Sequence, residues 1–159
     1  MNKLKVFIIV FILTNQAAQA RSTYEQILDN KPSIDRTYAL KLSIIIDSIA
    51  DKYKIPANAI ASIAMVESSY KLNAINRHSN DFGIMQINSY NIKAYKLDRD
   101  RLLTDLNYSV ESGAKIFKWF YKTYGTLEEA TKRYNCGTKK SCTTWKGPIK
   151  YWSRVVKYL

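Results

Sequence analysis

The chain has 159 residues, and 25 Lys and Arg against 13 Asp and Glu give it a formal net charge of +12. With 47% hydrophobic and 13% aromatic residues, 5 Gly and 3 Pro, the composition fits one globular domain and excludes disordered, collagen-like and low-complexity proteins. Because the chain has 1 His and 2 Cys, it cannot assemble a zinc site of ordinary ligand count, and no metal or other cofactor is predicted.

The first twenty residues have the features of a secretory signal peptide. Lys3 and Lys5 precede an apolar run at residues 6–13, and Ala-Gln-Ala at residues 18–20 is a small-x-small cleavage pattern. We expect cleavage after Ala20 and export to the periplasm. The alternative, a membrane anchor, would need roughly 20 apolar residues, and no second apolar run follows. No membrane span is therefore expected in the mature chain.

The next segments differ in periodicity. Residues 21–35 are the least periodic, and we expect a loosely packed N-terminal lead-in there. Residues 36–159 are predicted to form one domain without an internal linker. At its start, Leu40, Ile44 and Ile49 have helical spacing, which predicts an amphipathic helix over residues 36–54.

Two neighbouring segments contrast in polarity. Residues 57–69 follow Pro56, which suits a first helical turn, and almost no polar residue interrupts them, so a deeply buried helix is predicted. Residues 73–91 are rich in Asn, Ser and Asp. They are predicted to form an irregular segment with a short extended piece at 83–88, which could wall a cleft.

The rest of the chain is predicted to be helical. Asp105 is a suitable cap for a helix that runs to residue 124 and ends at Gly125, and residues 126–129 match a capping box for a shorter helix to about residue 134. Gly147 and Pro148 begin a last helix. The expected fold is all-α, with five or six helices around a substrate cleft.

Cys136 and Cys142 are the only cysteines. Because export leads to an oxidising compartment, one short disulfide loop is the simplest interpretation, and two free buried thiols are the alternative.

The positive charge has three interpretations, namely nucleic acid, an anionic membrane or an acidic envelope polymer. The basic residues are spread along the chain and are not interleaved with aromatic residues as a nucleic-acid stacking surface requires. Neither of the common glycine-rich nucleotide-binding motifs occurs. We therefore expect no nucleic-acid partner and a diffuse attraction to the cell wall or to anionic lipid.

Glu67 is the most distinctive titratable residue. It continues the apolar stripe of Ile60, Ile63 and Ala64 at spacings of three and four, which places it on the buried face near the C-terminus of its helix. Burial and the helix end both favour the neutral carboxyl. A carboxyl that is protonated near neutral pH can donate a proton to a glycosidic oxygen. The alternative is a frayed helix end that leaves Glu67 in water.

Three short segments resemble, in order, the motifs of lytic transglycosylases. They are Glu-Ser-Ser-Tyr at 67–70, Phe-Gly-Ile-Met-Gln-Ile-Asn at 82–88 and Arg-Tyr-Asn-Cys-Gly at 133–137, which are similar to the family's Glu-Ser, Gly-Leu-Met-Gln and Ala-Tyr-Asn motifs. The resemblance covers about residue 36 to the end. It is strongest to the small exported members that accompany type III, type IV and conjugative secretion machines, and it implies a lysozyme-like fold and peptidoglycan glycan strands as substrate.

The resemblance also implies roles for single residues. Glu67 would be the only catalytic acid and base, and Ser68 would support the helix end beside it. Gly83 would let the backbone approach a sugar, Met85 would lie against a sugar face, and Gln86 would form a hydrogen bond with an N-acetyl or hydroxyl group. Met85 could equally be a core residue, and Gln86 a capped loop residue.

Further roles fall in the C-terminal part. Tyr134 would touch Glu67 or belong to the core, Asn135 would brace the cleft, and Tyr151 is a weaker correspondence. Arg133 stands where the family usually has Ala. This difference bears on whether the backbone around Tyr134 and Asn135 follows the family's conformation.

The resemblance allows either one or two catalytic acids. A transglycosylase uses one carboxyl: Glu67 would protonate the leaving oxygen and then deprotonate the muramyl 6-hydroxyl, which closes a 1,6-anhydro ring. Residues 81–89 are also similar to the segment of animal lysozymes that holds their second acid. Asp81 would then support hydrolysis as the second carboxylate.

Two other classes of function remain open. A non-catalytic wall-binding or assembly protein on the same fold would bind sacculi through its charge, without releasing muropeptides. A basic membrane-active protein would permeabilise anionic vesicles independently of Glu67.

Overall fold

The computed structural model describes residues 21–159, so the predicted signal peptide lies outside the described residues. Residues 21–159 form eight α-helices, a 3-10 helix and a small three-stranded sheet. In chain order these are α1 Thr23–Asn30, α2 Arg36–Tyr53, α3 Ala57–Ser68, β1 Ile75–Asn76, β2 Asp81–Phe82, β3 Ile87–Asn88, α4 Ser89–Ala94, α5 Arg99–Thr104, α6 Leu106–Tyr124, α7 Leu127–Cys136, the 3-10 helix η1 Cys142–Thr144, and α8 Lys146–Val156. The predicted mainly-α, lysozyme-like fold is confirmed, with more helices than the five or six expected.

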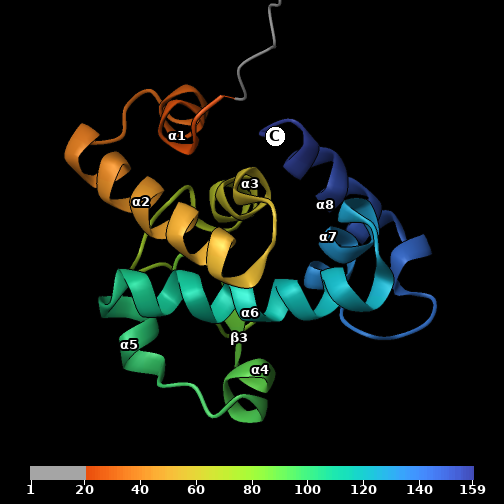
Figure 1. Cartoon of the computed structure of the whole chain (residues 1–159). Helices are drawn as coiled ribbons and strands as arrows, with labels where there is room; N and C mark the ends of the chain where they lie inside the picture. The colour runs from red at the N-terminus through yellow and green to blue at the C-terminus, as the bar shows by residue number, and fades with distance from the viewer. Residues whose placement is uncertain (1–20) are drawn as a thin grey trace, which may run out of the picture.

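Helix α6 runs across the middle of the molecule (Figure 1). α2 and α3 lie above it in that view, α4 and α5 below, and α7 and α8 toward its right-hand end. α2, α5 and α7 pack directly against α6, and α3 packs against α1, α2 and α8. Their buried faces form one core, whose largest fully buried side chains include Ile27, Leu42, Ile46, Ile60, Ile63, Ile84, Met85, Leu102 and Phe117.

Capping side chains fix the helix ends where the sequence predicts them. Asp105 accepts a backbone hydrogen bond at the start of α6, and Gly125 ends that helix with a left-handed φ of 79°. Thr126 accepts a hydrogen bond from the Glu129 amide at 3.2 Å and starts α7. The Glu129 carboxylate does not return the bond, because it pairs with Arg133 at 3.0 Å, so half of the predicted capping box forms.

Helix α1 corrects the prediction of a loosely packed lead-in at residues 21–35. Ile27 is fully buried, and α1 packs against α2 and α3. The side-chain amide of Gln26 donates hydrogen bonds to the Asn58 carbonyl at 3.0 Å, the Ser62 hydroxyl at 3.0 Å and the Tyr158 carbonyl at 2.7 Å. The first helix is thereby joined both to α3 and to the segment that follows α8.

Helix α2 has the predicted length but turns a different face to the core. Leu42 and Ile46 are fully buried, whereas Leu40 and Ile44 are 50% and 60% exposed. Ile49 is buried as expected. Because apolar residues stand at 44, 45 and 46 in a row, the spacing alone does not select one face of the helix.

The segment at 73–91 is more regular than predicted. β1, β2 and β3 pair antiparallel in that order, with Phe82 opposite both Ile75 and Ile87. The predicted extended piece at 83–88 is limited to Ile87 and Asn88, because residues 83–86 form the turn between β2 and β3.

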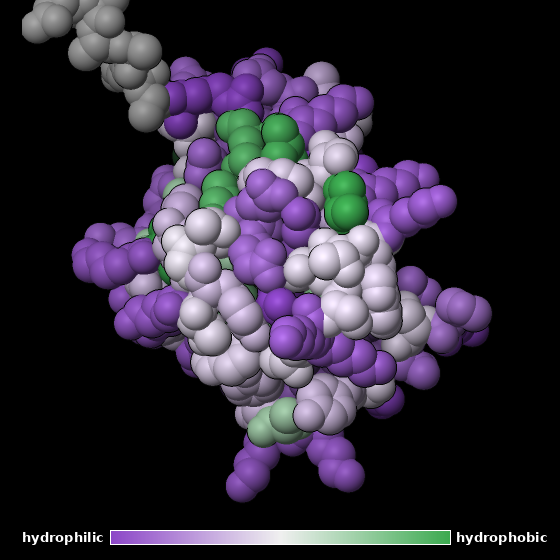
Figure 2. Space-filling model, turned by 90° about the vertical axis from the view of Figure 1, so that its right-hand side faces the viewer, coloured by the Kyte–Doolittle hydropathy of each residue, from purple (hydrophilic) through white to green (hydrophobic). Residues whose placement is uncertain are grey.

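The surface is mainly polar on the side formed by α7 and α8. Figure 2 shows hydrophilic side chains over most of this side, with small and separate apolar patches. Across residues 21–159, no helix combines the length and hydropathy that a membrane crossing needs.

Candidate active site

Glu67 lies in the last turn of α3, the most apolar helix of the fold. The helix ends because Ser69 and Tyr70 both adopt left-handed backbone, with φ of 52° and 62°. The amides of these two residues bond back to the carbonyls of Met65 at 2.9 Å and Ala64 at 3.3 Å. The chain therefore reverses immediately after Glu67 and Ser68, and the carboxyl of Glu67 stands at the rim of the core, half-buried.

The carboxyl of Glu67 has one hydrogen-bond donor from a distant helix. The hydroxyl of Tyr151, on α8, donates to Glu67 Oε1 at 2.6 Å. Tyr151 is buried, and burial together with the nearby Glu67 charge raises its pKa well above the ordinary range. The tyrosine therefore stays protonated and remains a donor at neutral pH.

Opposing effects set the titration of Glu67. Burial is the strongest influence and raises the pKa of Glu67 from an ordinary 4.5 to about 7, with a further raising contribution from the charge of Asp81. The hydrogen bond from Tyr151 and the positive charge of Arg154 lower the pKa. The result is a carboxyl that is partly protonated at neutral pH, as the sequence predicts for a proton donor.

Arg154 was not among the predicted site residues. Its guanidinium donates to the Val66 carbonyl at 3.1 Å, next to Glu67 in the chain. Arg154 follows Tyr151 by three residues, so both lie on the same face of α8. This spacing is the sequence signal that could have identified Arg154.

Tyr134 lies close to Glu67 without a hydrogen bond to it. Its hydroxyl donates to the Met85 carbonyl at 2.8 Å. Burial and the charges of Glu67 and Asp81 raise the pKa of Tyr134 well above the ordinary range, which places the ring within electrostatic reach of both acids. Tyr134 thus fixes the turn between β2 and β3 against α7.

That turn is also fixed from α3 and α6. The Ser68 hydroxyl donates to the Ile84 carbonyl at 2.8 Å, which supports the predicted role of Ser68 at the helix end. A Cβ added to Gly113 on α6 would lie 2.5 Å from the Met85 Cβ, so the missing side chain of Gly113 makes room for the Met85 side chain. Met85 is fully buried, and the predicted contact of its side chain with a sugar face is therefore wrong.

Gly83 also has a different role from the predicted one. Its φ is 80°, and a Cβ there would lie 2.5 Å from the Leu102 carbonyl oxygen and 2.5 Å from the Ser109 hydroxyl. Gly83 is buried, so its small size lets the turn approach α5 and α6 and not a ligand. The side-chain amide of Gln86 donates to the carbonyls of Gly83 at 2.9 Å and Ala74 at 3.2 Å, as a capped loop residue would.

Glu67 faces an open cavity of about 670 Å³, here called the acid cavity. It is lined by Glu67, Ser68, Ser69, Lys71, Ala74, Ile75, Asn76, Arg77 and Gln86. Thus Gln86, although its amide is occupied, lies at the same cavity as the acid. The remaining walls come from the loop after α3 and from the first strand.

A second cavity of about 510 Å³, here called the aromatic cavity, lies between α4, α6 and the end of α7. Its lining includes Asn88, Tyr90, Tyr95, Trp119 and Asn135. Tyr90 is 80% exposed, Tyr95 46% and Trp119 45%. None of the three was among the predicted site residues. Asn135 thus lines this cavity, one residue beyond Tyr134.

Asp81 lies on β2, near the acid. Its carboxylate accepts a hydrogen bond from the Ser79 hydroxyl, and Asn88 on β3 is its pairing partner in the sheet. Its negative charge raises the pKa of Glu67. The structure therefore brings the two carboxyls singled out from the sequence within electrostatic reach of each other.

The disulfide between Cys136 and Cys142 is present and closes the loop beside the aromatic cavity. Arg133, which stands where the family usually has Ala, is buried beneath this loop. Its guanidinium donates to the carbonyls of Gly137 at 3.4 Å and Lys139 at 3.1 Å. The arginine therefore takes part in holding the loop.

The fold and this site define a class of protein. The transglycosylase SLT domain family matches residues 44–148, more than half of the chain, and the chain therefore belongs to that family.

Three similar proteins have a related sequence over part of their length. Protein IpgF of Shigella flexneri is 34% identical over 98 residues, which cover 58% of this chain and 64% of that protein. Invasion protein IagB of Salmonella typhi is 38% identical over 92 residues, 54% of this chain and 58% of that protein. The X polypeptide of Escherichia coli is 30% identical over 95 residues, 56% of each chain. The chain thus spans less than two thirds of the length of each relative.

Proposed function

We propose that this protein is a lytic transglycosylase that cleaves the β-1,4 bond between N-acetylmuramic acid and N-acetylglucosamine in peptidoglycan. The observation that carries the proposal is Glu67, a carboxyl with a pKa of about 7 that is bonded to Tyr151 and opens into the acid cavity. Membership of the transglycosylase SLT domain family supports the same activity.

The first step needs the protonated acid. Glu67 gives its proton to the glycosidic oxygen while the bond from that oxygen to the muramyl C1 breaks, and the bonding electrons leave with the oxygen. The N-acetyl group of the substrate stabilises the cation at C1. As Glu67 becomes a carboxylate, the short hydrogen bond from Tyr151 strengthens and stabilises its charge.

The second step returns the proton. The Glu67 carboxylate takes the proton of the muramyl 6-hydroxyl, and the oxygen attacks C1 to close a 1,6-anhydro ring. The carboxyl is thereby restored, and no water is consumed. One carboxyl is enough for both steps.

A glycan strand can be accommodated along the acid and aromatic cavities. Gln86 lines the first cavity and Asn88, two residues further along the chain, lines the second. Tyr90, Tyr95 and Trp119 offer exposed rings for sugar faces in the aromatic cavity. We propose that the strand crosses from one cavity to the other past Glu67.

Hydrolysis by a lysozyme-type mechanism is the second candidate. The observation that favours it is Asp81, whose charge acts on Glu67 and which could stabilise the cation in place of the N-acetyl group.

We further propose that the protein acts in the periplasm, where it opens the wall locally for a type III, type IV or conjugative secretion apparatus. The signal-peptide pattern at residues 1–20 supports export. The similarity to a protein named as an invasion protein is consistent with service to such an apparatus.

Mass spectrometry of the soluble products from intact sacculi tests the activity. Residues 21–159 should release muropeptides with anhydromuramyl ends, and Glu67→Gln should reduce their release at least about a thousandfold, since it removes the only proton donor that both steps use. Reducing ends would support hydrolysis and a role for Asp81. Products that do not depend on Glu67 would contradict both mechanisms, and sacculus binding without products would indicate a wall-binding protein.

A further inference from the structure

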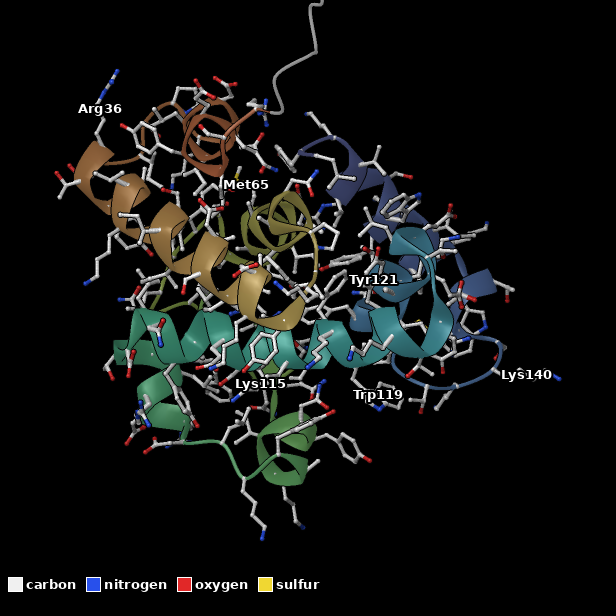
Figure 3. All side chains as sticks on the ribbon, in the orientation of Figure 1. Arg36, Met65, Lys115, Trp119, Tyr121 and Lys140 are labelled. Carbon is white, nitrogen blue, oxygen red and sulfur yellow. A yellow bond between two sulfur atoms is a disulfide. The ribbon has the colours of Figure 1, made fainter. Side chains whose placement is uncertain are left out.

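A third cavity lies outside the acid cavity and the aromatic cavity. It has a volume of about 390 Å³ and is formed by the end of α2, the residue after α4 and the outer face of α6. We call it the basic groove; its main lining residues are Tyr53, Tyr95, Lys115, Lys118, Trp119 and Lys122. Figure 3 labels Lys115 and Trp119 on α6, between α2 and α4.

The charge of the basic groove is one-sided. Lys115, Lys118 and Lys122 line it, and no acidic side chain does. The nearest acid, Glu111, is bonded to Lys52 at 2.7 Å and lies 3.6 Å from Lys115. Among residues 21–159, no carboxylate lies within ion-pair distance of the other two lysines.

Aromatic rings hold the groove in shape. The ammonium of Lys118 lies 4.7 Å from the centre of the Tyr53 ring, whose hydroxyl donates to Glu111 at 2.6 Å. Trp119 packs edge-on against Phe120 at 5.0 Å, which leaves 45% of the tryptophan exposed. The groove therefore offers fixed aromatic walls and two cations without acidic partners.

The basic groove continues the aromatic cavity. Tyr95 and Trp119 line both of them. A ligand that fills the aromatic cavity therefore has the groove next to it, around these two rings. A group that extends from that ligand past Tyr95 and Trp119 into the groove would be near Lys118 and Lys122, which line it.

We propose that the basic groove binds the anionic stem peptide of a muramyl residue whose sugar occupies the aromatic cavity. This inference rests on the proposed function, since it assumes a peptidoglycan strand in the cavities. Each muramyl residue carries its peptide on a lactyl side arm, and the peptide bears free carboxylates. Those carboxylates match the unpaired lysines in charge, and the short apolar parts of the peptide match the ring faces.

Binding to two forms of sacculi tests this inference. The Glu67→Gln protein binds without cutting, so its affinity is measured for intact sacculi and for sacculi from which an amidase has removed the stem peptides. We expect about five- to tenfold tighter binding to intact sacculi, the size of effect that two exposed charge pairs and ring contacts produce. Lys118→Glu with Lys122→Glu should reduce this ratio to about one.

A control pair separates the groove from diffuse charge. Lys41→Glu with Lys146→Glu changes the net charge equally at exposed positions outside the groove and should keep the ratio. If the reversal pair fails to fold, the neutral pair Lys118→Gln with Lys122→Gln makes the same test.

Three outcomes would overturn the inference. They are equal binding of Glu67→Gln protein to both forms of sacculi, an unchanged ratio in the groove variants, and loss of the ratio in the control pair. If the groove variants instead lose only their binding to phosphatidylglycerol vesicles, the groove binds lipid. Failure of the native protein to release products would refute the proposed activity alone, because the binding comparison needs no cleavage.

Discussion

The acid at position 67 depends on a residue that lies far away in the sequence. The apolar stripe of α3 predicts that Glu67 is buried near a helix end, because that information is local. Tyr151, a weak correspondence at the level of motifs, donates the hydrogen bond to its carboxyl across 84 positions of sequence. A partner at that separation depends on how α8 packs, which spacing within either helix does not encode.

The pH dependence of activity follows from the protonation of this acid. Since the first step needs the neutral carboxyl, the rate should fall as pH rises through about 7. Tyr151→Phe removes a hydrogen bond that lowers the pKa of Glu67, so the alkaline limb should move to higher pH. The rate at pH 6 should fall about tenfold, as expected when a hydrogen bond to a charged group is lost.

Product release from sacculi between pH 5 and 9, for the native protein and Tyr151→Phe, measures both effects. Tyr158→Phe serves as the matched control, because that residue is not bonded to Glu67. An alkaline limb that stays in place, or moves to lower pH, in Tyr151→Phe would contradict this account of the acid.

At the scale of elements, the sequence predicts best where pattern and caps agree. α3 and α6 have long apolar stripes with defined ends, and both lie where they were expected. α4 and α5 are six residues each and polar, so they carry too few apolar positions to show a period. The predicted core face of α2 was wrong for a related reason. Apolar residues stand in a row at 44–46, so their spacing does not select one face of the helix. The role of Gly83 was missed, and Met85 was left open between a sugar contact and a core position, because motif resemblance does not reveal which neighbour fills the space.

The packing of α6 against the turn between β2 and β3 can be tested by a substitution at Gly113. A Cβ in Gly113→Ala would meet Met85 at 2.5 Å and would force the side chain away from its position. We expect a loss of about 1–3 kcal/mol in the free energy of unfolding, which is typical of overpacked cores. Activity should fall as well, because the Met85 carbonyl accepts the hydrogen bond from Tyr134 beside the acid.

Urea denaturation followed by circular dichroism gives the free energy of unfolding for each variant. Gly147→Ala on α8 is the control, since nothing lies within 4 Å of the added Cβ. It should be as stable as the native protein, or up to about 1 kcal/mol more stable, because alanine favours helix. Equal stability of both variants would show that Gly113 is not tightly packed.

At the scale of the whole molecule, one side chain joins segments from both halves of the chain. Gln26 is buried and bonds to Asn58, Ser62 and Tyr158. Gln26→Ala should lower the free energy of unfolding by about 2–3 kcal/mol, because it removes three hydrogen bonds and the packing of a buried side chain, while Asn58, Ser62 and Tyr158 keep other partners. Asp29→Ala on the same helix removes only an exposed ion pair with Arg21 and should change the stability by less than about 1 kcal/mol.

Thermal and urea unfolding of these two variants measures the difference. A Gln26→Ala protein as stable as the Asp29→Ala protein would contradict the role assigned to the Gln26 hydrogen bonds. Gln26→Met distinguishes the cause, since it keeps a side chain of similar size while removing the donors.

The bond between Gln26 and Tyr158 spans 132 positions, and this has a consequence for biogenesis. While a ribosome or an export channel still holds residue 158, the first helix lacks one of its partners, and the native arrangement cannot close. Docking of α1 through this bond is thus delayed until residue 158 has emerged. In the periplasmic export that we propose, delayed closure would keep the polypeptide competent for translocation, and Glu67 would form its bond with Tyr151 only after translocation.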